Sequence, residues 1–389
     1  MTPADEAQLS EAVAHAAAAG TPLEIQGGGT RTGLGRPVQA EKTLSVAGLS
    51  GITLYEPGAL TLVARAGTPI AEIEAALAAE GQMLAFEPPD HRALLGSEGT
   101  PTIGGAVAVA ASGPRRIQRG ACRDFMLGAR LVDGQGQPVS NGGRVMKNVT
   151  GIDLVKLMAG SFGTLGVLSE ISFKVLPAPQ AVAVLTLSGL DDARAVEAMA
   201  EAMGSPFDVS GAAHVPAGTD GAAQTLIRVE GLEGSVAYRA EELKTQLEAI
   251  SEVAIDTDPE STASTWRAIR DVEAFAGRTG AVWRLSVKPT DAPGIVDALR
   301  AEMPIEALYD WVGGLVWLVV PEENDAAATA IRTQIAAHGG HATLIRASAA
   351  TRAAVDVFQP EPAPLAHIST GLRAKFDPKG ILNPGRVSA

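Results

Sequence analysis

The sequence predicts an α+β protein of two domains, and three observations carry this prediction. The chain has 389 residues, more than one ordinary hydrophobic core accommodates. Its first part gives the order helix, strand, strand, helix, which is typical of an α/β layer. From about residue 180 to 350, strands and amphipathic helices alternate, which indicates a sheet with helices on one face.

The N-terminal elements follow from local signals. Residues 5–19 predict a helix with acidic side chains in its first turn, and Gly20 ends it. Strands are predicted at 22–26 and 61–67, and a second helix at 70–81.

Small residues dominate the next elements. Residues 99–113 are almost wholly small, and a helix is predicted within this range. Residues 125–140 predict a hairpin with Asp133-Gly134 in its turn. Residues 160–177 predict a glycine-rich turn that leads into an alternating strand.

The second part repeats a strand followed by a helix. The predicted strands are residues 181–189, 224–231, 281–289, 314–321 and 341–348. The predicted helices are residues 191–203, 235–250, 292–303 and 324–338. The strand at 314–321 is the most apolar, which predicts a central, buried position in the sheet.

Composition and charge exclude several classes of function. The net charge of -13 argues against a nucleic-acid backbone as the main partner and against electrostatic docking on anionic lipid. The single cysteine, Cys122, excludes an internal disulfide and a cysteine-ligated iron–sulfur cluster within this chain. The acidic N-terminus is no secretory signal and no apolar run is long enough to span a bilayer, so we expect a cytosolic protein.

The stretch IQGGGTRTGLG, residues 25–35, indicates an anion-binding loop. A dinucleotide fingerprint fails because Thr32 occupies its third glycine position, and a P-loop fails because no Gly-Lys-Ser/Thr end is present. A glycine-rich loop between strands can instead form a nest of backbone N–H groups for phosphate, and Arg31 can add a charge-assisted contact. A tight structural turn is the alternative for this loop taken alone.

Two further glycine clusters favour a long diphosphate ligand. Gly104 and Gly105 are expected to open a helix whose N-terminal N–H groups and dipole attract phosphate. The alanines that follow, among them Ala108 and Ala111, would let a large flat ligand lie against the backbone. A third cluster spans residues 160–166.

Longer runs resemble the FAD-binding domain of the vanillyl-alcohol oxidase type. They are GTPTIGGAVAVAASGPRRIQRGACRDFMLGARLVDGQG and GGRVMKNVTGIDLVKLMAGSFGTLGVLSEISFKVLP, and FDPKGILNPGR resembles the C-terminal signature of the glycolate and D-lactate dehydrogenase branch. The resemblance implies a two-lobed FAD-binding domain at 1–177 and a reduced α/β cap domain at 178–360, with a sheet covered by helices. Residues 361–389 are then a segment that returns to the FAD-binding domain.

The resemblance also implies which residues hold FAD. Asp124 either lies near the adenosine end or stabilises the turn, and Asn383 and Arg386 are expected to approach the isoalloxazine. No histidine or cysteine occupies the loop after Gly29, so we expect FAD to be non-covalent; the family commonly has Asn where Ala111 stands. The expected FAD-binding residues are Gln26, Gly27, Gly28, Gly29, Thr30, Arg31, Thr32, Gly33, Thr102, Gly104, Gly105, Ser112, Gly113, Arg115, Arg119, Gly120, Asp124, Gly160, Ser161, Gly163, Thr164, Gly166, Val167, Asn383 and Arg386.

Catalytic relatives carry the segments G-D-G-N-x-H and E-H-G-x-G, which supply a metal and a base, and this sequence has neither. We therefore expect no metal site, and we interpret His91 as a surface histidine beside two prolines. Arg270, Arg284 and Lys288 lie where such relatives clamp a substrate carboxylate. Solvated charges at element ends are the interpretation that we favour, so catalytic residues stay unassigned.

The sequence keeps the FAD-binding domain, lacks the metal-binding and base segments, and has a reduced cap domain. In this combination it resembles the E-subunit family of bacterial glycolate oxidases. This implies a complex with a catalytic flavoprotein and an iron–sulfur subunit that acts on glycolate. The complex is expected in the cytoplasm, or at the inner membrane through its partners. Two alternatives stay open: a self-sufficient FAD-dependent dehydrogenase of 2-hydroxy acids such as D-lactate, and an assembly subunit whose FAD never cycles.

Overall fold

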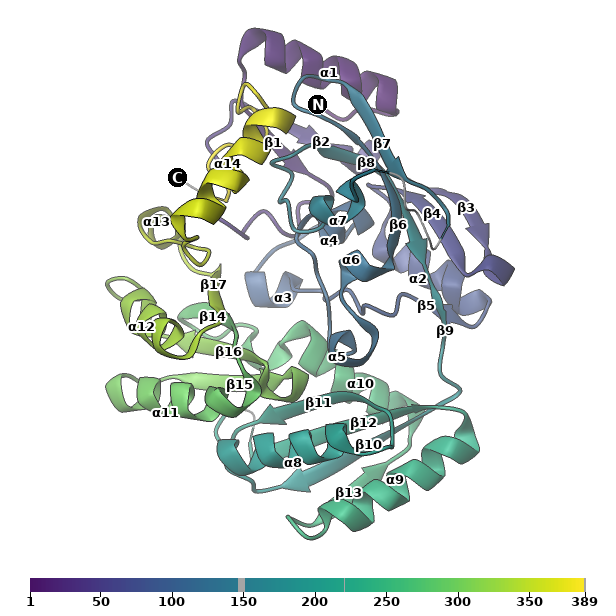
Figure 1. Cartoon of the computed structure of the whole chain (residues 1–389), viewed down its shortest axis with the longest axis vertical. Coiled ribbons are helices and arrows are strands. Elements are labelled where there is room, and N and C mark those ends of the chain that lie inside the picture. The colour runs from purple at the N-terminus through teal and green to yellow at the C-terminus, as the bar shows by residue number, and fades with distance from the viewer. Residues whose placement is uncertain (146–150, 220, 388–389) are drawn as a thin grey trace.

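The computed structural model describes residues 1–145, 151–219 and 221–387, and it combines helices with sheets throughout (Figure 1). The expected α+β class is confirmed. Residues 146–150 of the family-like run, MKNVT, lie outside the described residues.

Among the described residues, the first part of the chain contains helices and three separate sheets. Its elements are α1 (Glu6–Ala19), β1 (Leu23–Gln26), β2 (Lys42–Ser45), β3 (Ile52–Glu56), β4 (Thr61–Arg65), α2 (Ile70–Ala79), β5 (Gln82–Met83), α3 (Arg92–Leu95), α4 (Ile103–Ala108), α5 (Arg116–Arg119), α6 (Cys122–Phe125), β6 (Met126–Val132), β7 (Pro138–Gly142), α7 (Leu154–Met158), β8 (Val167–Lys174) and β9 (Leu176–Pro177). Of the three sheets, β5 and β9 form the smallest together.

The second part contains longer helices and one large sheet, followed by two helices. Its elements are β10 (Ala181–Ser188), α8 (Asp192–Gly204), β11 (Val209–Val215), β12 (Gln224–Gly231), α9 (Glu233–Leu247), β13 (Val253–Asp256), α10 (Pro259–Asp271), β14 (Ala281–Ser286), α11 (Ala292–Glu302), β15 (Glu306–Asp310), β16 (Leu315–Val320), α12 (Ala328–His338), β17 (His341–Arg346), α13 (Ala349–Ala354) and α14 (Ala363–Phe376).

Two lobes form the first part. In one, β1 and β2 pair in parallel. In the other, an antiparallel sheet has the strand order β3-β4-β8-β6-β7. Leu9 of α1, Leu44 of β2, Ile73 of α2 and Phe173 of β8 belong to one continuous core, so the lobes are packed as a unit.

The predicted hairpin at 125–140 is confirmed as β6 and β7, which pair antiparallel. Asp133 stabilises the turn, because its carboxylate accepts hydrogen bonds from the N–H groups of Gln135 (2.9 Å) and Gln137 (2.8 Å). This turn chemistry is the usual role of an aspartate in a hairpin.

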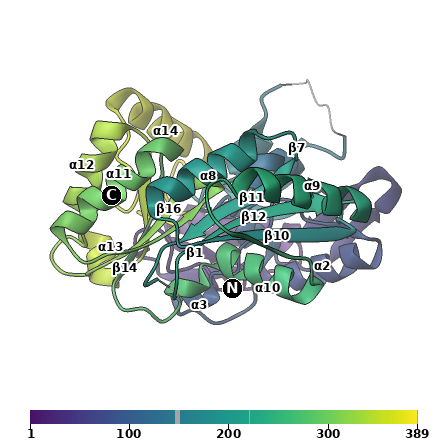
Figure 2. The same ribbon diagram turned by 90° about the horizontal axis from the view of Figure 1, so that it is seen from below.

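The eight-stranded sheet of the second part has the order β13-β10-β12-β11-β15-β16-β14-β17. Four helices, α8, α9, α11 and α12, pack on one face and form a single core with it. Figure 2 shows α8 and α9 on one side of the sheet and α10 on the other. The apolar strand β16 is buried along its whole length between β15 and β14, as predicted.

The other face of this sheet packs against α10 and against the first part. Trp317 and Val282 on that face share a core cluster with Leu34 and Leu94. One face of the eight-stranded sheet, called the cap sheet below, therefore forms the boundary between the two parts. Figure 1 shows the first part above this boundary and the cap sheet below it.

Candidate functional site

A cleft of about 760 Å³ of atom-free space, partly open to solvent, lies in the first part of the chain. Three segments line it: the glycine-rich loop after β1, the start of α4 and the loop before β8. Of the expected FAD-binding residues, it is lined by Gln26, Gly27, Gly28, Gly29, Thr30, Arg31, Thr32, Thr102, Gly104, Gly105, Ser161, Gly163, Gly166, Val167, Asn383 and Arg386.

Close backbone packing and one turn explain the three consecutive glycines. A Cβ on Gly28 would lie 1.9 Å from the carbonyl oxygen of Thr100, and one on Gly27 would lie 2.2 Å from Oγ1 of Thr102. Gly29 has a φ of 81°, in the left-handed region that favours glycine. These glycines therefore serve first to seat the loop against residues 100–102, and not only to admit a ligand.

The loop itself offers free donors. Among the residues that the structure describes, none accepts a hydrogen bond from a backbone N–H between Gly28 and Gly33. Gly33 does not line the cleft, and a Cβ there would meet nothing within 4 Å. A run of such N–H groups beside a cleft is the arrangement that binds phosphate.

The start of α4 differs from the expectation. The helix is only six residues long, and its first donors have partners inside the protein. The N–H groups of Ile103 and Gly104 donate to Thr68 and Ala66, and that of Gly105 donates to the Thr102 side chain. Local packing therefore uses these donors, although Thr102, Gly104 and Gly105 line the cleft as expected.

The C-terminal segment holds the glycine-rich loop in place. Oδ1 of Asn383 accepts a hydrogen bond from the N–H of Ile25 (2.7 Å), and Nδ2 donates to the carbonyl of Phe162 (2.7 Å). Arg386 donates to the carbonyls of Thr32 (2.7 Å) and Leu34 (3.0 Å). Both side chains line the cleft, but protein groups occupy their polar atoms.

Arg31 is also engaged by the protein. Its guanidinium donates to the carbonyl oxygen of Pro89 at 2.6 Å. Burial lowers the pKa of Arg31 although Asp90 acts in the opposite direction. The side chain lines both the cleft and the cavity described below, so it marks where the two meet.

Several expected residues lie outside the cleft lining and stabilise local turns. The N–H of Gly160 donates to Val107, and the hydroxyl of Thr164 donates to Ser161 at 2.7 Å. Asp124 accepts from the N–H of Ala121 at 2.8 Å and so caps α6. Asp124 was expected either near the adenosine end of FAD or as a residue that stabilises the turn. Its described contacts are those of a residue that stabilises the turn.

The stretch RRIQRG, residues 115–120, also lies away from the cleft. Arg119 is exposed, and Gly120 adopts a φ of 103° and packs against Asp124. Gly113 accepts a hydrogen bond from Nε1 of Trp311 at 3.1 Å, which joins the first part to the cap sheet.

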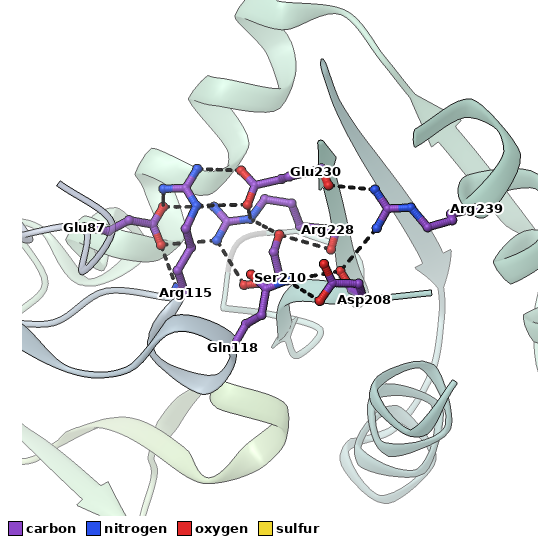
Figure 3. A network of polar contacts seen from close by, with 8 residues as sticks. All are labelled: Glu87, Arg115, Gln118, Asp208, Ser210, Arg228, Glu230 and Arg239. Atoms are coloured by element: carbon purple, nitrogen blue, oxygen red, sulfur yellow. Dashed lines mark hydrogen bonds and ion pairs between the residues drawn. The ribbon is translucent and has the colours of Figure 1, made fainter. Parts of the chain in front are cut away.

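Arg115, expected at FAD, instead belongs to an ion network between the two parts (Figure 3). Its guanidinium lies 2.6 Å from a carboxylate oxygen of Glu87, and its Nε donates to Glu230 at 2.9 Å. Arg228 completes the network at 3.0 Å from Glu87. Burial favours a raised pKa for Glu230, but Arg228 and Arg115 outweigh it and hold that pKa at about 2.

A second cavity of about 780 Å³ lies where the first part meets the cap. It shares Arg31, Leu34, Val109 and Phe162 with the cleft, so the two lie next to each other. Ser112 lines this cavity and not the cleft. The cap contributes a wall that is apolar apart from Arg284 and Thr343, which consists of Arg284, Leu315, Trp317, Thr343, Leu344, Ile345 and Phe358.

Of the three basic candidates, Arg284 alone lines this cavity. Arg270 is paired with Asp271 at 2.8 Å, and Lys288 is exposed with Asp291 at 3.7 Å. Burial, followed by repulsion from Arg116, lowers the pKa of Arg284 to about 10. No side-chain hydrogen bond or ion pair joins it to another described residue, and its guanidinium carbon lies 5.5 Å from the ring centroid of Trp311.

His91 is not the surface histidine that we expected. Its ring lines the second cavity and meets Trp317 edge-on, with ring centroids 5.5 Å apart. Its Nε2 is shielded from solvent and has no hydrogen-bond partner among the described residues. Burial, then the charges of Arg31 and Arg284, lower the pKa of His91 to about 3, so the ring is neutral at pH 7. The sequence shows only adjacent prolines; the packing of Trp317 buries the ring.

The sequence analysis also missed the apolar lining of the cleft. Strand alternation and the small residues of α4 were the available signals. The apolar lining residues that were not predicted are Ile25, Leu34, Val46, Ala66, Val109, Phe162 and Leu168, whereas Ala108 lines the cleft as expected. Among the described residues, no three His, Cys, Asp or Glu side chains are grouped to hold a metal ion.

Comparison with known proteins identifies the family. The sequence is 40% identical to glycolate oxidase subunit GlcE of Escherichia coli (strain K12) over 382 residues, 98% of this chain and 97% of that protein. The chain belongs to the glycolate oxidase subunit GlcE family. Residues 1–141 match the family described as FAD binding domain. The chain is thus an FAD-dependent oxidoreductase flavoprotein.

Two other relatives match only in part. D-lactate dehydrogenase of Anaerostipes hadrus is 39% identical over 109 residues, 28% of this chain and 22% of that protein. Glycolate oxidase subunit GlcD of Bacillus subtilis (strain 168) is 37% identical over 95 residues, 24% of this chain and 19% of that protein. The likeness of this chain to these two proteins is therefore confined to about a quarter of its length.

A solved structure of alkyldihydroxyacetonephosphate synthase superimposes with a TM-score of 0.70 at 17% identity, covering 99% of this chain and 76% of that one. This likeness shows the shared fold and confirms the expected vanillyl-alcohol-oxidase-type architecture. Among the described residues, no helix combines the length and apolar character needed to cross a membrane.

Proposed function

We propose that this chain is the FAD-binding subunit of a glycolate oxidase complex that converts glycolate to glyoxylate. A catalytic flavoprotein and an iron–sulfur subunit are its proposed partners. The chain's own flavin then serves electron transfer or supports the complex. FAD, when bound, takes up two electrons and can release them singly, which suits an iron–sulfur partner.

The observation that carries the FAD site is the row of unpartnered N–H groups from Gly28 to Gly33 beside the cleft. We assign the FAD diphosphate to this loop, because these donors and the absence of Cβ atoms suit an anion. Within the part of the chain that the structure describes, no cysteine or histidine lines the cleft, which supports non-covalent binding. The sequence identity to GlcE along nearly the whole chain supports the place in a glycolate oxidase.

A second candidate function, a self-sufficient dehydrogenase of 2-hydroxy acids, is favoured by the second cavity. Arg284 faces that cavity without a carboxylate partner among the described residues. Such a guanidinium is suited to a substrate carboxylate.

Flavin bleaching distinguishes the functions. The purified chain, loaded with FAD, is mixed anaerobically with glycolate or D-lactate, alone and with its partner subunits. Bleaching only in the complex supports the proposed subunit, whereas rapid bleaching of the isolated chain supports the dehydrogenase. Full complex activity with a Gly28→Ala chain that lacks FAD would show that this flavin never cycles.

A further inference from the structure

The helix α14, at the left edge of the molecule in Figure 1, contains no buried residue among those that the structure describes. Every other described helix of ten or more residues has buried side chains. A helix as short as α14 is only marginally stable in water by itself, and Gly371 within it lowers its helix propensity further. Packing must therefore stabilise α14, and this chain supplies only part of that packing.

The large apolar side chains of α14 lie on one face. Leu365, Ile368, Leu372 and Phe376 follow the spacing i, i+3, i+7 and i+11, which places them along one stripe of a helix. Phe376, at the C-terminal end, packs against the core of the first part. Towards the N-terminus, Leu365 and Ile368 are 53% and 57% exposed. Single exposed apolar residues are ordinary, but two neighbours on the open face of an anchored helix indicate a contact surface.

The charged side chains of α14 are basic. The helix contains no aspartate or glutamate, and Arg373 and Lys375 flank the apolar stripe on its two sides. No ion pair joins either of them to another described residue. The whole chain, by contrast, has a net charge of -13. The stripe and its flanks therefore complement a protein surface on which carboxylates border an apolar groove.

The segment around α14 also supports the glycine-rich loop. After the helix, Leu382 pairs with Leu23 at the start of β1, and the side chain of Asn383 supports the loop that follows. Before the helix, Arg352 of α13 donates to the carbonyl of Gly35, at the end of that loop, at 2.9 Å. A protein that binds α14 therefore contacts the same segment that holds the loop assigned to FAD.

We infer that the exposed apolar face of α14 is the docking surface for the iron–sulfur subunit, which offers an apolar groove bordered by carboxylates. The inference rests on the proposed function, in which that subunit has to approach this flavin to accept its electrons. A second copy of the chain fits less well, because two α14 helices packed together bring like charges into contact. An anionic membrane fits less well because it repels a chain with a net charge of -13.

The test measures binding of the FAD-loaded chain to the purified iron–sulfur subunit by anaerobic biolayer interferometry. The double change Leu365→Ala and Ile368→Ala is expected to weaken binding about thirtyfold, as for two apolar side chains at the centre of an interface. Alanine is the best helix former, so the variant should keep α14 and its FAD. Lys375→Glu is expected to weaken binding about tenfold at low salt and less at high salt.

Tyr238→Ala is the matched control, because Tyr238 is 62% exposed on the helix α9 of the cap. It is expected to change the affinity less than about twofold. If the double variant loses FAD, Lys375→Glu decides by the same measurement, because it removes no apolar contact.

Unchanged affinity of the α14 variants, an equal loss in Tyr238→Ala, or a loss of binding to the catalytic flavoprotein in place of the iron–sulfur subunit overturns the inference alone. A homodimer seen by light scattering, or sedimentation with phosphatidylglycerol vesicles, that the double change abolishes also overturns it, because α14 then binds another copy or lipid. A wild-type chain that holds FAD and binds neither partner subunit overturns the proposed function as well.

Discussion

Two regions lie between the first part and the cap sheet, the ion network and the second cavity, and their arginines have opposite surroundings. In the network of Figure 3, Arg115 of the first part pairs with Glu230 of β12, and Arg228 of β12 pairs with Glu87 of the first part, while Arg115 also pairs with Glu87. In the second cavity, Arg284 forms no ion pair with another described residue, although the buried carboxyl group of Asp310 is near enough to act on its pKa. Since an unpaired buried charge is costly, the pairing, and not the burial, separates a structural arginine from a candidate ligand-binding one.

The largest effect is expected from breaking the network. Arg228→Ala leaves Glu87 and Glu230 with one guanidinium between them, and we expect the free energy of unfolding to fall by about 3 to 5 kcal/mol. Urea unfolding measures it. Glu197→Ala, which removes the exposed pair with Arg194, is the control and is expected to change stability by less than about 1 kcal/mol. Equal effects of the two changes contradict a structural role for the network.

The next largest effect is expected on FAD affinity, from a substitution in the glycine-rich loop. There the backbone N–H groups without partners are proposed to bind the FAD diphosphate. Gly28→Ala brings a Cβ to 1.9 Å from the Thr100 carbonyl, and overpacking of this kind costs about 1 to 3 kcal/mol. We expect FAD affinity to fall about tenfold or more, as measured by the flavin-to-protein absorbance ratio after dialysis. Gly33→Ala, with no atom within 4 Å, is expected to retain FAD; a similar loss there contradicts this account.

The ion network is expected to contribute less to the free energy of unfolding as the pH falls. The pKa of Glu230 falls from 4.5 to about 2 in the folded protein. Its contribution is therefore fully present above about pH 4.5 and is lost as the pH falls towards 2. Urea unfolding of the wild type and of Glu230→Gln between these limits should give a stability difference that shrinks with acid. A constant difference contradicts the assignment.

The smallest effect is expected at Arg284. Because this guanidinium has no ion pair to lose, Arg284→Gln should change the free energy of unfolding by less than about 1 kcal/mol in the absence of ligand. Measured beside Arg228→Ala under the same conditions, it gives the sharpest contrast between the two regions. A loss as large as that of Arg228→Ala would mean that Arg284 is structural.

Local signals in the sequence were sufficient for much of the fold. The alternation of strands and helices after residue 180 predicted β10, β12, β14, β16 and β17, because each buries an apolar run. The strand β11 (VSGAAHV) escaped, since its glycine and alanines show no strand pattern although every residue is buried. Its burial comes from neighbouring strands, which the local sequence does not reveal.

The site was predictable where backbone geometry dictates residue type, as in the glycine-rich loop. It was not predictable where long-range pairing decides a side chain's role. Arg115 lies in a family-like motif, yet Glu230, a partner 115 positions away, determines its contacts. His91 lacked any local sign of burial, because Trp317 from the cap shields it.

The support of the glycine-rich loop by Asn383 has a consequence for biosynthesis. Ile25 and the residue that holds its N–H are 358 positions apart. The ribosome therefore synthesises the glycine-rich loop long before it adds Asn383, whose side chain holds that loop in place. Cofactor capture is expected to follow, and not accompany, translation of most of the polypeptide, so nascent chains arrested before residue 380 should emerge without yellow colour.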